Sequence, residues 1–282
     1  MNVPARLVVR HIFTALALAT CALIPLRATA QDEAQIGAQV YQELAKKGEI
    51  IDASPWYAIL NEIGERVAQV GDTQYQFPFH FILVDEKQPN AFSVPGGNVY
   101  VTLPLMSFVE NKEELAGVLC HEISHDIHHD VVHLARKRQT TGLIAVGLDV
   151  LFGGGNPILG NAINASAQLQ TLHFSRAVEE NADRLGAENC ARAGYDPWGM
   201  VWLFQQFEKA GTGGHMEMLS DHPTDAHRIT ALESEFKSAP ELYSHYNASV
   251  SSAHKMPTLS SLRAQYGDVH PLEPAKRAGY QR

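Results

Sequence analysis

The feature that most constrains this chain is the run His121-Glu122-Ile123-Ser124-His125, a His-Glu-x-x-His pattern. On an α-helix, residues four apart lie on one face, so His121 and His125 can direct both imidazoles at a single metal ion. Glu122 is rotated by about 100° from His121, so its carboxylate can reach a water molecule held by that metal. Because five-residue patterns also occur by chance, this one needs a true helix and a third ligand.

The residues around the pattern predict that helix. Asn111 is a suitable N-cap, and Glu114 at the third helical position resembles a capping box. The apolar side recurs at helical spacing and consists of Leu115, Val118, Leu119 and Ile123. We therefore predict one amphipathic helix of about 25 residues that ends near Arg138.

A later helix, predicted over 166–193, supplies a third ligand. A catalytic zinc site usually has three protein ligands and a water molecule. We favour Glu179 over Glu180, because Glu179 and Asp183 are four residues apart and share a face. Asp183 can accept a hydrogen bond from a ligand imidazole and fix its tautomer. Gly186 continues this face and would let the two helices approach closely.

These residues predict hydrolysis by a metal-activated water. The metal lowers the pKa of its water from about 15.7 towards 7, and Glu122 takes the proton and delivers it to the leaving amine. The oxyanion that forms needs a positive or hydrogen-bonding partner, for which His222 and Arg228 are the candidates. We place His129 in a buried hydrogen-bond shell around the metal ligands. We expect His128 and His133, on the same helix, to lie at the surface.

The remaining segments predict a mainly helical α+β chain. Helices are expected over 32–47 and 54–71, with a buried strand over 79–84. Residues 90–94 and 98–103 flank Pro95-Gly96-Gly97 and predict an antiparallel hairpin. The strand through Asn90, Ala91 and Phe92 either only covers the core or forms an exposed edge that pairs with an extended substrate peptide.

The first thirty residues are typical of an export signal. Arg6 and Arg10 precede a mostly apolar stretch over 11–26, and Ala28-Thr29-Ala30 is a small-x-small cleavage site. We predict a mature start at Gln31. The alternative is a lipoprotein with Cys21 as the lipidated residue.

Composition narrows the function classes. The 282 residues are 45% hydrophobic, which suffices for a substantial core and excludes wholesale disorder. The net charge is −9, and removal of residues 1–30, with three arginines and no acid, makes it −12. Such a chain is a poor partner for nucleic acid or anionic lipid.

Two cysteines, Cys120 and Cys190, would remain after export. Export permits a disulfide, but we favour two small buried thiols. Cys120 adjoins the first histidine, whereas Cys190 lies eleven residues past Glu179, roughly 16 Å away along a helix.

An apolar, glycine-rich segment covers residues 142–163. We predict a helix, a flexible loop and a second helix that lie over the site, with a membrane-touching loop as the alternative. Its uninterrupted apolar run is too short to span a bilayer.

Several motifs together resemble a known family. They are His121-Glu122-x-x-His125, Ser175-Arg176 with Glu179-x-x-Ala182-Asp183-x-x-Gly186, Asn90-Ala91-Phe92, Pro95-Gly96-Gly97 and His222-Pro223. They are similar to zinc metallopeptidases of the CAAX-prenyl-protease type, the group that contains HtpX, BepA and LoiP. The resemblance covers residues 33 to 235. It implies a mainly helical, gluzincin-like domain with a small antiparallel sheet, one zinc ion per chain and endopeptidase activity.

The resemblance also implies roles for particular residues. His121, His125 and Glu179 would bind zinc, and Glu122 would be the catalytic base. In some members a histidine at the position of His222 sits over the metal and blocks it until substrate or a partner displaces it. The expected organisation is a signal over 1–30, a metallopeptidase domain over 31–237 and a polar, loosely packed tail over 238–282.

We therefore expect a periplasmic zinc endopeptidase that acts on misfolded or unassembled envelope proteins. We expect no transmembrane helix after the signal and no docking onto a large assembly complex; the oligomeric state stays open. One alternative is a chaperone or assembly factor with a structural or closed zinc site, although an intact Glu122 argues against it. Another is a metal-storage or delivery protein, which would bind more than one metal per chain.

Overall fold

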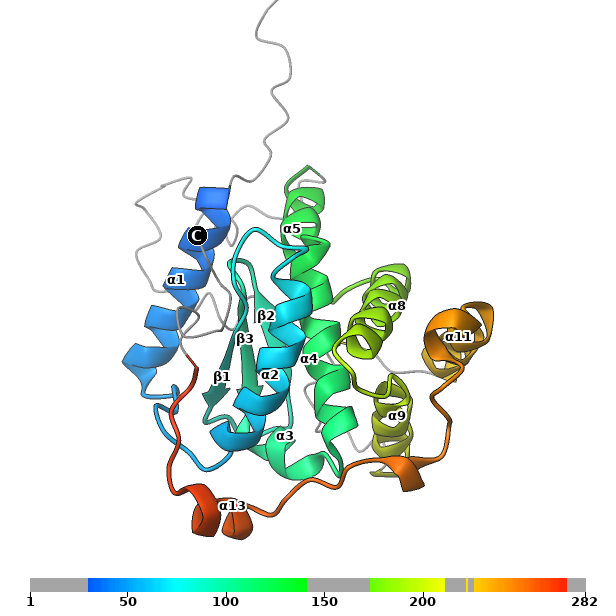
Figure 1. Cartoon of the computed structure of the whole chain (residues 1–282). Coiled ribbons are helices and arrows are strands. Elements are labelled where there is room, and N and C mark those ends of the chain that lie inside the picture. Colours follow the sequence, from blue (N-terminus) through cyan, green and yellow to red (C-terminus); the bar gives the residue numbers. More distant parts are fainter. Residues whose placement is uncertain (1–29, 141–172, 211–221, 223–225, 273–282) are drawn as a thin grey trace, which may run out of the picture.

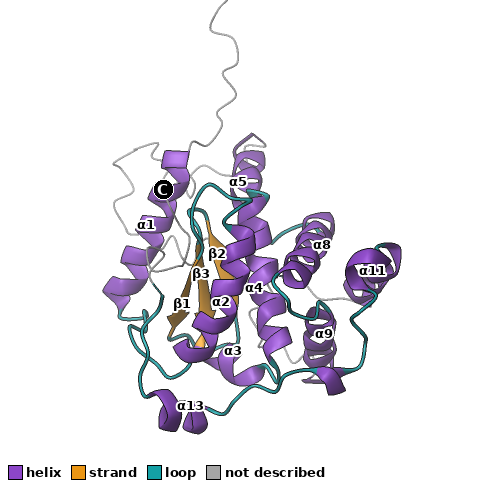
Figure 2. Ribbon diagram, in the orientation of Figure 1, coloured by secondary structure: helices purple, strands orange, loops and turns teal. Residues whose placement is uncertain are grey.

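The structure, a computed structural model, describes residues 30–140, 173–210, 222 and 226–272. Its described part is mainly helical with one small sheet (Figure 2). The first half consists of α1 (Ala30–Lys47), α2 (Tyr57–Gly71), β1 (His80–Val84), β2 (Ala91–Val94), β3 (Asn98–Thr102), α3 (Leu103–Phe108), α4 (Lys112–Ile127) and α5 (Asp130–Thr140). The second half consists of α8 (Arg176–Arg192), α9 (Trp198–Ala210), α11 (Ala226–Ser238), α12 (Pro240–Tyr243), the 3₁₀ helix η2 (Val250–Ser252) and α13 (Leu259–Tyr266).

The three strands lie in the order β1-β3-β2. The predicted hairpin is confirmed, because β2 and β3 pair antiparallel around Gly96 and Gly97, which both have positive φ. However, β1 pairs parallel with β3, so the sheet is mixed and not purely antiparallel as predicted. The reason is that β3 lies between the other two strands and pairs antiparallel with β2 and parallel with β1. Strand β2 is thereby at one edge of the sheet.

Alternate residues of the strands face two separate cores. Ile82 and Val84 of β1 pack with the apolar stripe of α1, together with Val131 and Ala135 of α5. On the other face, Phe81 and Leu83 of β1 pack with residues from α2 and α4. This period of two is what a strand buried on both faces requires. The sheet therefore lies between α1 on one side and α2 with α4 on the other (Figure 1).

Helix α4 begins as predicted. The Asn111 side chain accepts a hydrogen bond from Glu114 N at 2.8 Å, and the Glu114 carboxylate accepts one from Glu110 N at 2.7 Å. The predicted continuous helix to Arg138 is wrong, because α4 ends at Ile127. His129 has a positive φ of 54°, and a new helix, α5, begins at Asp130.

Helices α4 and α8 lie side by side and run antiparallel, as the contacts His125–Glu179, His121–Asp183 and Cys120–Cys190 show. Gly186 permits this packing, because a Cβ there would lie 3.1 Å from His121 N. Among described residues the helix begins at Arg176, not at 166 as predicted, because Ser175 is extended at ψ 154°. Residues 166–172 lie outside the described part.

The segment after α11 is not the loose tail that we predicted. It runs along the lower edge of the molecule in Figure 1, from α11 past α9 and α3 to α13 and on to the start of α2. Trp202 Nε1 donates to Ala248 O, Met256 N donates to Glu110 O, and Ser54 pairs with Val269. The Leu262 side chain is 2% exposed. The polar composition of this segment gave no indication of these contacts, because only a few of its residues make them.

Several predictions fall on residues outside the described part. They concern residues 1–29 of the predicted signal, which include Cys21, and the apolar segment 142–163. Within the described ranges, none of the helices has the length and apolar character needed to cross a bilayer.

Candidate metal centre

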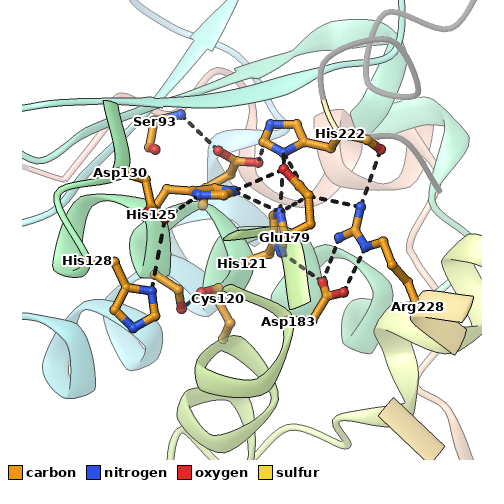
Figure 3. A network of polar contacts seen from close by, with 12 residues as sticks. Ser93, Cys120, His121, His125, His128, Asp130, Glu179, Asp183, His222 and Arg228 are labelled. Atoms are coloured by element: carbon orange, nitrogen blue, oxygen red, sulfur yellow. Dashed lines mark hydrogen bonds and ion pairs between the residues drawn. The ribbon is translucent and has the colours of Figure 1, made fainter. Parts of the chain in front are cut away.

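Four buried side chains converge on one point of the structure. One nitrogen or oxygen atom from each of His121, His125, Glu179 and His222 lies within 4.8 Å of the others. The Nε2 atoms of His121 and His125 are 3.1 Å apart, and Glu179 Oε2 lies 3.5 Å from His121 Nε2. Figure 3 shows them pointing toward one another from α4, α8 and the segment before α11. It is the one such metal-binding group among the described residues.

Each histidine of α4 has a carboxylate close to its other ring nitrogen. His121 Nδ1 lies 3.0 Å from Asp183 Oδ1, as the spacing on α8 predicted. His125 Nδ1 lies 2.8 Å from Asp130 Oδ2. Such partners orient the ring and fix which nitrogen carries the proton. Both Nε2 atoms are consequently left to face the centre of the cluster.

Glu122 points toward the same centre from the side of β2. Its Oε2 accepts a hydrogen bond from Ser93 N at 2.9 Å. Its Oε1 has no hydrogen-bond partner among the described residues and lies 3.7 Å from His222 Nε2. One carboxylate oxygen is therefore fixed by the strand, while the other faces the cluster.

Arg228 lies behind the carboxylates and not at an oxyanion position. Its Nε and Nη2 donate to the two oxygens of Asp183 at 2.7 and 2.6 Å, and its Nη1 lies 3.0 Å from Glu179 Oε2. Nη1 also donates to His222 O at 3.3 Å. The guanidinium is occupied by these partners, so we no longer assign it to the oxyanion. It positions Asp183, Glu179 and the backbone of His222.

The charges of the cluster are strongly coupled. Burial lowers the pKa of an imidazole, yet the carboxylates of Asp183 and Glu179 raise the pKa of His121 to about 10. Burial together with His121 and His222 lowers the pKa of His125 to about 3. Burial acts against the charged form of Glu179 too, but His222 and His121 hold its pKa well below the usual range. A cation bound here would compete with a proton for His121.

His129 does not join the buried shell in which we placed it. Its side chain is 39% exposed, and its Nδ1 lies 2.9 Å from Glu33 Oε1 of α1. The cause is the break after α4, which turns His129 away from the face of His121. Asp130, and not His129, contacts a ligand histidine, because its Oδ2 lies 2.8 Å from His125 Nδ1. The sequence did not reveal this contact, because a continuous helix would point Asp130 elsewhere.

The predicted edge strand runs beside the cluster. Ala91 and Phe92 begin β2, and Asn90 precedes it; within the described ranges β3 is the strand that pairs with β2. All three side chains are buried, and Phe92 stacks on Tyr100 of β3. The contact from Ser93 N to Glu122 connects this strand to the cluster, and no sequence pattern indicated that contact.

The donor set fits a zinc ion. Two imidazole nitrogens and a carboxylate are the ligand types of catalytic zinc sites. Carboxylates at the outer ring nitrogens and a buried, otherwise unpartnered Glu122 Oε1 are what such a site requires. Glu180, the rejected alternative, instead lies 3.0 Å from the exposed His227.

Comparisons with known proteins agree with this geometry. The model of peptidase family M48 matches residues 57–236. The β-barrel assembly-enhancing protease of Yersinia pestis is 33% identical over 183 residues, 61% of this chain and 37% of that protein. Its counterpart in Escherichia coli K12 is 29% identical over 209 residues, 70% of this chain and 42% of that protein. The mitochondrial metalloendopeptidase OMA1 of Arabidopsis thaliana is 31% identical over 151 residues, 54% of this chain and 30% of that protein.

The chain thus spans less than half the length of these relatives. The family match itself covers more than half of the chain and includes α4, α8 and His222. The chain therefore belongs to peptidase family M48.

Proposed function

We propose that this protein is a zinc-dependent endopeptidase with one zinc ion per chain. The observation that carries the proposal is the convergence of His121, His125 and Glu179 on one point (Figure 3). Glu122 Oε1 lies beside this cluster, 3.7 Å from His222 Nε2. A zinc ion held by those three side chains would lower the pKa of a water molecule and polarise the scissile carbonyl. The protein residues then supply the proton transfers and the positioning.

Glu122 is the general base of this proposal. Ser93 N holds Oε2, which leaves Oε1 free to accept a proton at the centre. The same carboxyl group then donates that proton to the leaving amine. Since Ser93 belongs to β2, this strand helps to position the base.

β2 is the proposed binding edge for substrate. An extended peptide that pairs with the side of β2 away from β3 would lie along the strand that holds Glu122. Recognition through backbone hydrogen bonds tolerates many side chains. This mode suits a protease that acts on unfolded polypeptides.

His222 is the proposed gate. Its Nδ1 lies 3.0 Å from Glu179 Oε1 and 3.4 Å from His121 Nε2, so the ring fills space that a substrate carbonyl would need. We expect His222→Ala to raise basal proteolysis or metal access. Unchanged values for both would contradict a gating role.

The proposed setting is the periplasm, with misfolded or unassembled envelope proteins as substrates. The names of the Yersinia and Escherichia relatives support this setting, because they refer to β-barrel assembly. The predicted signal over 1–30 agrees with export.

The test is cleavage of casein by the wild type and by Glu122→Gln, with bound zinc measured in both. We expect Glu122→Gln to keep its zinc and to lose at least about a hundredfold in rate, the scale of general base catalysis. Glu180→Gln is the matched control, because Glu180 faces His227 outside the cluster. Equal cleavage by zinc-loaded wild type and Glu122→Gln would contradict the proposal.

The same experiment separates the alternatives. A chaperone with a structural zinc site would show no cleavage by either protein, with zinc still bound. A metal-storage protein would bind more than one ion per chain.

A further inference from the structure

Two thiols that the proposed reaction does not use meet between α4 and α8. The Sγ atoms of Cys120 and Cys190 are 2.7 Å apart, although the residues are 70 positions apart in the sequence. Both are free cysteines and almost completely buried, with 0% and 1% of their surface exposed. The prediction that both side chains are buried is confirmed. The distance along α8 did not keep them apart, because α4 runs alongside that helix.

The backbones come close enough at this point for a covalent link. Gly186 lies one turn before Cys190 on α8, and a Cβ at Gly186 would be 3.3 Å from the carbonyl carbon of Cys120. A disulfide needs Cβ atoms about 3.5–4.5 Å apart and sulfurs about 2.05 Å apart, so an approach of about 0.7 Å would suffice.

We propose that Cys120 and Cys190 form a disulfide that joins α4 to α8. The bond forms by exchange with an oxidant that itself carries a disulfide, such as a dithiol oxidase or oxidised glutathione. The two thiols lose two protons and two electrons, and one S–S bond forms between them. The oxidant's disulfide accepts them and becomes two thiols.

The burial of both sulfurs determines when this exchange happens. A buried thiol is not open to attack by an external disulfide in the folded protein. The bond therefore forms while the chain folds, and the folded protein then protects it from reductants. The exported route that the sequence predicts is a compartment in which such bonds persist.

The position of the bond gives it a consequence for the metal centre. Cys120 directly precedes His121, and Cys190 lies seven residues after Asp183, which contacts His121. A covalent link here fixes the spacing between the helix with two histidine ligands and the helix with Glu179. This second part rests on the proposed metal-binding function, whereas formation of the bond does not.

The first test counts free thiols. The full chain is refolded with oxidised glutathione, denatured without reductant, alkylated and examined by peptide mass spectrometry. We expect a linked pair of peptides and no alkylation of Cys120 or Cys190, with both alkylated once reductant is added to the denatured protein. In the Cys190→Ser control, Cys120 should be alkylated. Full alkylation of both cysteines in the unreduced wild type would overturn the proposal.

The second test compares the protein refolded under oxidising and under reducing conditions, each loaded with zinc. We expect the oxidised form to melt about 10 °C higher, the scale for a loop of this length, and to lose zinc to a chelator several-fold more slowly. The double variant Cys120→Ala/Cys190→Ala should behave alike under both conditions, which controls for the reductant.

The outcomes separate the two claims. Equal zinc loss from the oxidised and reduced wild type would overturn the role of the bond at the metal centre. If neither form holds zinc, the proposed function fails, while the linked peptides and the melting difference still decide whether the bond exists.

Discussion

At the scale of single residues, Asp183 connects the parts of the centre. One of its oxygens lies 3.0 Å from His121 Nδ1, and both oxygens accept hydrogen bonds from Arg228. Arg228 in turn contacts Glu179 and the carbonyl of His222. Asp183 is not one of the proposed metal ligands. Through His121 and Arg228 it nevertheless helps to position the side chains that are.

Replacement of this carboxylate should weaken metal binding. Asp183→Asn keeps the size of the side chain but removes the charge that holds His121 and Arg228, so we expect zinc affinity to fall by about 10–100-fold. Competition with a chromogenic chelator measures this change. The control is Glu188→Gln on the same helix, since Glu188 pairs with the exposed Arg192 and not with the cluster. An unchanged affinity of Asp183→Asn would show that the contact is not used.

At the scale of elements, the start of α4 contains a buried carboxyl group, Glu114, whose charged form is disfavoured by the loss of contact with water. Glu114 is 2% exposed, and burial raises its pKa to about 7 despite hydrogen bonds from Glu110 N and Asn111 Nδ2. The folded state thus holds a proton that the unfolded state releases at lower pH. The stability from this group is present at acid pH and is lost as pH rises to about 7.

Glu114→Gln should remove that pH dependence. Between pH 4.5 and 7 the wild type should lose up to about 3 kcal/mol of unfolding free energy relative to Glu114→Gln, because the variant has no proton to release. Urea unfolding at pH 5 and pH 8 measures the difference. The same gap between the two proteins at both pH values would contradict a raised pKa.

The elements also show where sequence reasoning stops. The N-cap of α4 and the faces of His121, His125, Glu179 and Asp183 depend on local spacing, and they were predictable. The break at His129 was not, because no glycine or proline marks it and its partner Glu33 comes from α1. Asp130 and Ser93 reach the centre only through that break and through the pairing of β2.

At the scale of the whole molecule, the segment after α11 crosses the domain. It contacts the N-terminal ends of α2 and α4 through Ser54, Glu110 and Lys112. These contacts join residues that are far apart in the sequence, and therefore periodicity could not predict them. In Figure 1 the segment runs along the bottom of the molecule, below the sheet.

A pair of leucines on α13 tests how firmly this segment is anchored. Leu262 is 2% exposed, whereas Leu259 on the same helix is 37% exposed. We expect Leu262→Ala to cost about 2–5 kcal/mol of unfolding free energy and Leu259→Ala much less. Denaturant unfolding measures both. Equal small effects would show that the segment adds little to stability.

The proposed function depends on the binding of zinc by side chains of α4 and α8. Anomalous diffraction at the zinc edge from crystals of the zinc-loaded wild type tests it most directly. We predict one anomalous peak within bonding distance, about 2.0–2.2 Å, of His121 Nε2, His125 Nε2 and a Glu179 oxygen. A peak bound by other residues, or no peak at this cluster, would contradict it.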